Sequence, residues 1–146
     1  MKVRSSVVAL GAAAVLGGTC ALAVPALAST QTTTHTLRFT SVSGPGVNFT
    51  KTTSGQQDKD VNTKGKVIGF DEIYFSFNLK TGTGTGNVAL VVRGGVLYGT
   101  LKLTQSSISG RVTGGTGAFA HAKGTITAHN LNKAGTRTAV TIRYHS

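Results

Sequence analysis

Carboxylates are the side chains of this sequence best suited to move a proton, and the chain has only four: Asp58, Asp60, Asp71 and Glu72. Asp71 and Glu72 are neighbours in a segment that alternates apolar and polar residues, so they point to opposite faces and form no paired site by themselves. Asp71 shares its face with Ile73 and Phe75. If this face is buried, the pKa of Asp71 rises and its carboxyl can serve as a general acid or base. The alternative is a structural aspartate that caps a bend or pairs with a Lys or Arg.

The other residue types that commonly do chemistry are scattered or absent. The four histidines do not lie at metal-ligand spacing on one element, so we expect no metal site, and only His121 lies in a glycine-rich loop. The sequence has no G-x-S-x-G elbow and no G-K-[ST] loop, which leaves serine hydrolysis and nucleotide hydrolysis without support. Residues 115–120 match G-x-G-x-x-A, the dinucleotide-binding fingerprint, but no acidic residue follows Glu72 that could bind the ribose of a dinucleotide. We therefore expect no cofactor.

The first 28 residues have the features of an export signal. Lys2 and Arg4 form a positive start, residues 7–24 are apolar or small, and residues 26–28 read Ala-Leu-Ala, an A-x-A cleavage site. A retained anchor is the competing interpretation, but the run is short of the ~20 apolar residues of a membrane span. We expect a signal peptide over 1–28, cleavage near Ala28, a disordered lead-in over 29–34 and one secreted, extracellular domain over 35–146. Cleavage would remove Cys20, so no disulfide is expected.

Charge is distributed unevenly along the chain. The sequence has 15 Lys and Arg residues against 4 Asp and Glu, a net charge of +11, and loss of Lys2 and Arg4 with the signal peptide would leave +9. All acids precede residue 73, whereas residues 73–146 carry only basic charges. Such a basic protein attracts acidic envelope polymers, or is simply soluble outside the cell. We expect no nucleic acid partner, because the chain is predicted to be exported and has no basic run interleaved with exposed aromatics.

Short alternating segments separated by Gly, Asn and Ser indicate an all-β protein. Residues 36–41, 67–79, 88–93, 96–104, 107–113, 125–131 and 136–145 have the period of two that is typical of half-buried strands. We expect a turn at 43–46, a short strand at 47–51, and a polar loop from Thr52 to Lys66 that could cover an opening. Seven to nine strands with tight connections favour a single antiparallel up-and-down barrel.

One glycine-rich stretch carries a family resemblance. It reads Gly114-Gly115-Thr116-Gly117-Ala118-Phe119, followed by Ala122-Lys123-Gly124, and resembles the GGTG-x-F and A-[RK]-G motifs of the allene oxide cyclase and dirigent barrels. The resemblance implies an eight-stranded antiparallel barrel, often trimeric, whose cavity takes a hydrophobic small molecule without a cofactor. Family members cyclise a fatty-acid epoxide or guide phenoxy-radical coupling. Dirigent proteins usually have Arg where this chain has Lys123, which keeps the charge but loses a planar bidentate donor.

These observations lead to two hypotheses. In the first, the barrel is a homotrimer or homodimer that binds a small hydrophobic ligand. If it is a cyclase or isomerase, Asp71 is the catalytic candidate. The expected ligand-binding residues are Phe75, Phe77, Leu97, Leu101 and Phe119. In the second, a filled, non-enzymatic barrel acts through its cationic exterior as a structural or interaction protein at the cell envelope. An eight-stranded lumen is just wide enough to be filled by side chains or to hold one small ligand, so the cavity volume separates the two.

Overall fold

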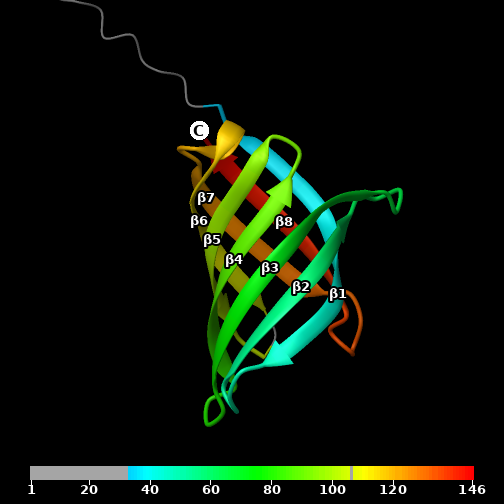
Figure 1. The fold of residues 1–146 in the computed structure, drawn as a ribbon, viewed down its shortest axis with the longest axis vertical. Coiled ribbons are helices and arrows are strands. Elements are labelled where there is room, and N and C mark those ends of the chain that lie inside the picture. Colours follow the sequence, from blue (N-terminus) through cyan, green and yellow to red (C-terminus); the bar gives the residue numbers. More distant parts are fainter. Residues whose placement is uncertain (1–32, 106) are drawn as a thin grey trace, which may run out of the picture. The chain divides into compact units, whose positions relative to one another are not determined.

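Eight antiparallel strands close into a barrel in the computed structural model, which describes residues 33–105 and 107–146 (Figure 1). Each strand pairs with the next one along the chain, and β8 pairs with β1. This confirms the predicted eight-stranded up-and-down barrel. The strands are β1 (His35–Asn48), β2 (Thr53–Val61), β3 (Val67–Asn78), β4 (Thr83–Val92), β5 (Gly95–Leu103), β6 (Ile108–Gly115), β7 (Lys123–Asn130) and β8 (Arg137–His145).

The expected signal peptide, its cleavage site and the lead-in up to residue 32 lie outside the described residues. No helix in the described part of the chain is long and apolar enough to cross a membrane.

Alternation along each strand separates the lumen from the outer surface. In β5, for example, Leu97 and Leu101 are buried while Tyr98, Thr100 and Lys102 are exposed. The same period places one buried cluster inside the barrel, contributed by several strands: Phe39, Leu90, Leu97, Leu101, Val112, Phe119, Ala122, Ile126 and Ile142. The predicted cationic exterior is also present, because the outward Arg and Lys side chains of the strands are exposed: Arg38, Lys102, Arg111, Arg137 and Arg143.

Three sequence predictions between residues 43 and 66 were wrong. Residues 43–46 form no turn, because β1 continues through them with a bulge between Ser43 and Gly46. β1 ends at Asn48, so residues 47–51 form no separate short strand. Thr53–Val61, expected inside a loop, is strand β2, so no long flap exists there. The prediction failed because β2 lacks apolar alternation. Its inward residues, Gln56, Asp58 and Asp60, are polar and serve as the polar part of the lumen.

One end of the barrel is closed by the glycine-rich stretch between β6 and β7. There the 3₁₀ turn η1 (Gly117–Phe119) buries the ring of Phe119, which is 4% exposed and meets Tyr144 edge-on at 5.5 Å between ring centroids. The β2–β3 and β4–β5 connections lie at this same end, because consecutive connections of an up-and-down barrel alternate between its ends. Figure 1 shows η1 beside the C-terminus at the top of the view.

The motif glycines allow this closure because backbones approach them closely. A Cβ on Gly124 would overlap the carbonyl oxygen of Arg143 on β8, and one on Gly115 would overlap that of Val96 on β5. Thr116 adds a link to β5, since its Oγ1 accepts a hydrogen bond from the Val96 N–H at 3.1 Å. The motif therefore packs the β6–β7 connection closely against β5 and β8.

Candidate functional site

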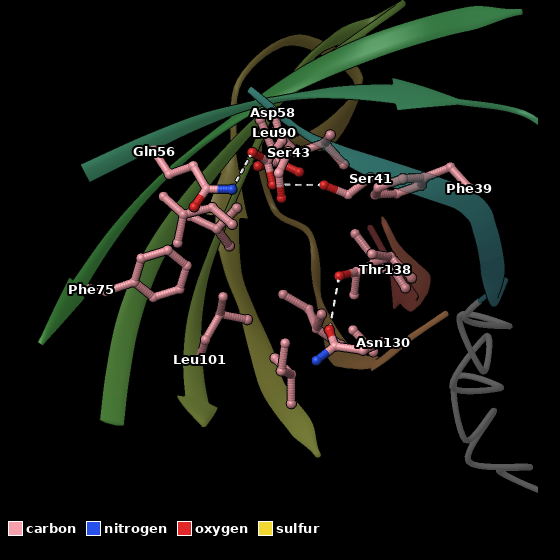
Figure 2. Close-up of a pocket in the computed structure, with 18 of the residues that line it drawn as sticks. Phe39, Ser41, Ser43, Gln56, Asp58, Phe75, Leu90, Leu101, Asn130 and Thr138 are labelled. Carbon is pink, nitrogen blue, oxygen red and sulfur yellow. Dashed lines mark hydrogen bonds between the residues drawn. The ribbon is translucent and has the colours of Figure 1, made fainter. Parts of the chain in front are cut away.

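A cavity of about 160 Å³ lies in the lumen, away from the end that Phe119 closes. Apolar side chains from seven strands, all except β2, form most of its wall: Phe39, Ile73, Phe75, Val88, Leu90, Leu97, Leu101, Ile108, Ile126, Ala128, Val140 and Ile142. Asn130, Gly135 and Thr138 are also in its lining, so the cavity extends toward the end with the β7–β8 connection. Thr138 donates a hydrogen bond from its hydroxyl to Oδ1 of Asn130 at 3.1 Å (Figure 2). The lumen is therefore not filled by side chains.

Two carboxylates, Asp58 and Asp71, are the ionisable side chains of this wall. They are cross-strand partners in the register of β2 and β3, and both point inward, with exposures of 7% and 5%. Asp58 accepts hydrogen bonds through both of its carboxylate oxygens. Its Oδ2 accepts from the Ser41 hydroxyl at 2.9 Å, and its Oδ1 accepts from the Gln56 amide at 2.6 Å and the Gly44 N–H at 3.2 Å. Figure 2 shows Ser41 and Gln56 reaching Asp58 from opposite sides.

Asp60 lies one inward position further along β2, opposite Gly69, and is fully buried. Neither of its carboxylate oxygens has a hydrogen-bond donor among the described residues, and Oδ1 of Asp71 also lacks one. Buried carboxylate oxygens without donors are costly, and one retained proton relieves the cost because a protonated carboxyl can donate to its neighbour. We therefore place a shared proton on Asp60, hydrogen-bonded to Asp71.

Burial and like charge raise both carboxyl pKa values. The pKa of Asp60 rises to about 8, first because of burial, then because of the charge of Asp71, the hydrogen bond with Asp71 and the charge of Asp58. Burial is also the first cause for Asp71, followed by the charge of Asp58, while hydrogen bonds from Asp60 and Ser41 act in the opposite direction; the pKa of Asp71 rises to about 6. Asp71 can thus exchange a proton near neutral pH, as a general acid or base requires.

The structure brings together four of the side chains selected from sequence. Asp71, Phe75, Leu97 and Leu101 all line the cavity. Phe119 lies at the closed end instead. Phe77 is not part of the lining; it is 38% exposed and stacks on Phe75 at 5.6 Å between ring centroids. Glu72 is exposed on the opposite face from Asp71, as the alternation predicted.

Sequence reasoning missed the other half of the acidic cluster. Asp58 and Asp60 were assigned to a loop, although their spacing of two residues already placed them on one face of any strand. The missing information was the pairing of β2 with β3, which brings Asp58 opposite Asp71.

The other predicted groups do not join this site. Within residues 33–105 and 107–146, no cluster of three His, Cys, Asp or Glu side chains is arranged to hold a metal ion. His121 is exposed beyond η1. Tyr74 and Tyr98 face outward and line a hollow of about 660 Å³ on the outer surface of β2–β5, near Phe49, which stacks on Tyr74 at 5.7 Å between ring centroids. This hollow is larger than the lumen cavity, but no buried ionisable side chain lines it.

No protein-family model and no curated protein matches this sequence. Solved structures with the same barrel do match. A pterocarpan synthase dirigent protein is similar over 85% of this chain and 94% of its own, with 16% identity and a TM-score of 0.69. A pyocyanin demethylase is similar over 75% of this chain and 99% of its own, with 15% identity and a TM-score of 0.63. The Diels-Alderase AbmU from Streptomyces koyangensis is similar over 82% of this chain and 71% of its own, with 9% identity and a TM-score of 0.61.

The class defined by the fold is therefore the eight-stranded barrel that dirigent proteins and Diels-Alderases share. The resemblance noted in the glycine-rich stretch agrees with this architecture. At these identities the similarity concerns the fold alone, and the residues of the lumen determine what chemistry is possible there.

Proposed function

We propose that this protein binds a small hydrophobic molecule in its lumen and moves a proton on it, as a cofactor-free cyclase or isomerase or as a guide of a coupling reaction. One observation carries the proposal: Asp71, a buried carboxyl, lines a mostly apolar cavity. A carboxyl in such surroundings is an effective general acid or base. The barrels of similar fold include a pterocarpan synthase dirigent protein and a Diels-Alderase, which supports this class of activity.

The cavity suggests the size of the ligand. Its volume of about 160 Å³ is below the few hundred Å³ of a drug-sized pocket. It is close to the ~150 Å³ of an apolar cavity that binds benzene. We therefore expect a ligand portion of one ring, or two small fused rings, packed between Phe39 and Phe75 with its polar atoms at Asp71.

Ligand binding can be tested with toluene, observed by saturation-transfer NMR. Leu101→Trp places a large side chain in the cavity and should abolish the signal. Tyr98→Trp makes a similar change on the outer face of the same strand and should leave binding intact. Equal binding by the two variants would place the ligand elsewhere and overturn the lumen as the site.

Proton transfer can be tested without knowing the substrate. The α-hydrogens of 1-indanone exchange with D2O when a base removes one of them, and mass spectrometry follows the exchange. Asp71→Asn should lower the rate at least about 100-fold, the typical contribution of a positioned base. Glu72→Gln makes the same chemical change on the outer face and should leave the rate unchanged. If Asp71→Asn exchanges as fast as the parent protein, Asp71 is not the base.

The exposed Arg and Lys side chains of the outer face support a second candidate function, in which the barrel interacts with acidic envelope polymers. Sedimentation with insoluble polygalacturonate measures this directly. Binding that weakens as salt rises from 50 to 300 mM supports it, whereas no sedimentation at low salt would remove it.

A further inference from the structure

Acidic and basic side chains are separated between the inside and the outside of the barrel. Three of the four acidic residues in the sequence, Asp58, Asp60 and Asp71, are buried on the inner face of β2 and β3. Only Glu72 faces outward, in a surface that carries exposed Arg and Lys side chains. The lumen is thus negative within a strongly positive protein, which is the reverse of what net charge alone suggests.

The negative charge inside is not neutralised by the protein itself. The groups that act on the carboxyls of Asp60 and Asp71 are each other, Asp58 and the Ser41 hydroxyl, none of which is positive. Leu90 on β4 and Leu97 on β5 continue the row of inward residues past Asp58 and Asp71, and both are apolar. Even with one proton on Asp60, the carboxylates of Asp58 and Asp71 remain beside an apolar cavity. Such a site favours a positive group that enters from outside.

Resting on the proposed function, we propose that the lumen selects ligands that combine one apolar ring with a protonated nitrogen, whose N–H groups bind Asp71 and whose charge is held between Asp58 and Asp71. Phe39 and Phe75 line the same cavity and add attraction, because aromatic faces bind cations. Carboxylate ligands such as fatty acids are disfavoured, since they would add a third negative charge.

Three probes of nearly the same shape test this selection: benzamidine is a cation, benzamide is neutral and benzoate is an anion. Each is titrated into the protein obtained by expressing the full chain, at pH 7.5, and binding is measured by NMR. Benzamidine should bind about tenfold more tightly than benzamide, because charge-assisted hydrogen bonds are roughly twice as strong as neutral ones. Benzoate should show no binding.

The outcomes separate this inference from the proposed function. If toluene and benzamide bind but benzamidine binds no better than benzamide, the lumen is a ligand site and the charge selection is wrong. If neither toluene nor any of the three probes binds, both proposals fail. Tighter binding of benzoate than of benzamidine would reverse the assigned sign of the site.

Variants and a change of pH test whether the carboxylates cause the preference for benzamidine over benzamide. Asp71→Asn should reduce the preference for benzamidine over benzamide to about twofold or less, while Glu72→Gln should leave it unchanged. Lowering the pH from 7.5 to 5 protonates Asp71, whose pKa is about 6, and should weaken benzamidine without weakening benzamide. A preference that survives both Asp71→Asn and low pH would come from another part of the protein and would overturn the assignment.

Discussion

Asp58 and Asp71 lie directly opposite each other on adjacent strands, with both carboxyls inside the barrel. Like charges in this arrangement normally destabilise a sheet. Here the hydrogen bonds from Ser41, Gln56 and Gly44 stabilise Asp58, and the proton placed on Asp60 stabilises Asp71. The cluster of Asp58, Asp60 and Asp71 can therefore gain or lose a proton while the barrel stays folded.

The first prediction concerns the dependence of stability on pH. The pKa of Asp60 rises from an ordinary 3.8 to about 8 in the folded protein, so between these values the folded chain keeps a proton that the unfolded chain has released. The free energy of unfolding therefore falls as pH rises through this window. Asp60→Asn removes this penalty. We expect the melting temperature to rise at pH 8 by about 4–8 °C per kcal/mol regained, with little change at pH 4.

Circular dichroism melts of the parent and Asp60→Asn at pH 4, 6 and 8 measure this effect. In Asp60→Asn the melting temperature should still decline, by a smaller amount, between pH 4 and 6, because Asp71 also has a raised pKa. Glu72→Gln, on the outer face, is the control and should follow the parent curve. A melting temperature of Asp60→Asn that is lower than the parent's at pH 8 would show that the ionised carboxyl is needed for the fold.

The second prediction concerns the closure of the barrel at Gly124. A methyl group at this position would overlap the Arg143 carbonyl oxygen on β8, and a backbone cannot give way as a side chain can. Gly124→Ala should lower the free energy of unfolding by at least about 1–3 kcal/mol, the usual cost of overpacking. Gly46→Ala in the β1 bulge meets its nearest atom at an ordinary 3.4 Å and should change stability by less than about 0.5 kcal/mol. Urea denaturation compares the two, and equal losses would remove the special role of Gly124.

The third prediction concerns Phe119, whose ring is buried at the same end of the barrel. Phe119→Ala should cost about 3–5 kcal/mol, because the ring is almost fully buried and its removal leaves a cavity. Phe77→Ala removes the same ring from a position that is 38% exposed and should cost much less. Urea denaturation again provides the measurement. Similar losses for the two variants would mean that Phe119 does not hold this end closed.

The fourth prediction concerns the N-terminal segment. We expect a host that exports the full chain to release a protein that begins near Ser29, because the A-x-A pattern ends at Ala28. Intact-mass measurement of the protein in the culture medium identifies the first residue. Recovery of the uncleaved chain in the cells alone would contradict the predicted signal peptide.

Regular alternation made most of the barrel predictable. β5 buries Leu97 and Leu101 on one face and exposes polar residues on the other, and in β3 the half-buried Ile73 and Phe75 alternate with exposed residues. This period of two is local information. β2 was missed because its inward residues are Gln and Asp, which no apolar pattern can reveal. Asp71 was found because it shares a strand with Ile73 and Phe75, whereas Asp58 and Asp60 have no apolar neighbour on their own face.

The sequence by itself determined the all-β architecture, the inward face of most strands and the place of Asp71 among them, since each of these follows from residues adjacent in the chain. Only the tertiary structure decided that three aspartates are buried together inside the barrel and that two of them, Asp58 and Asp71, line an open cavity. Their proximity depends on the register between β2 and β3, and their pKa values depend on burial by the other strands around the lumen. Pairing and burial are properties of the closed barrel, so residue order alone could not supply them.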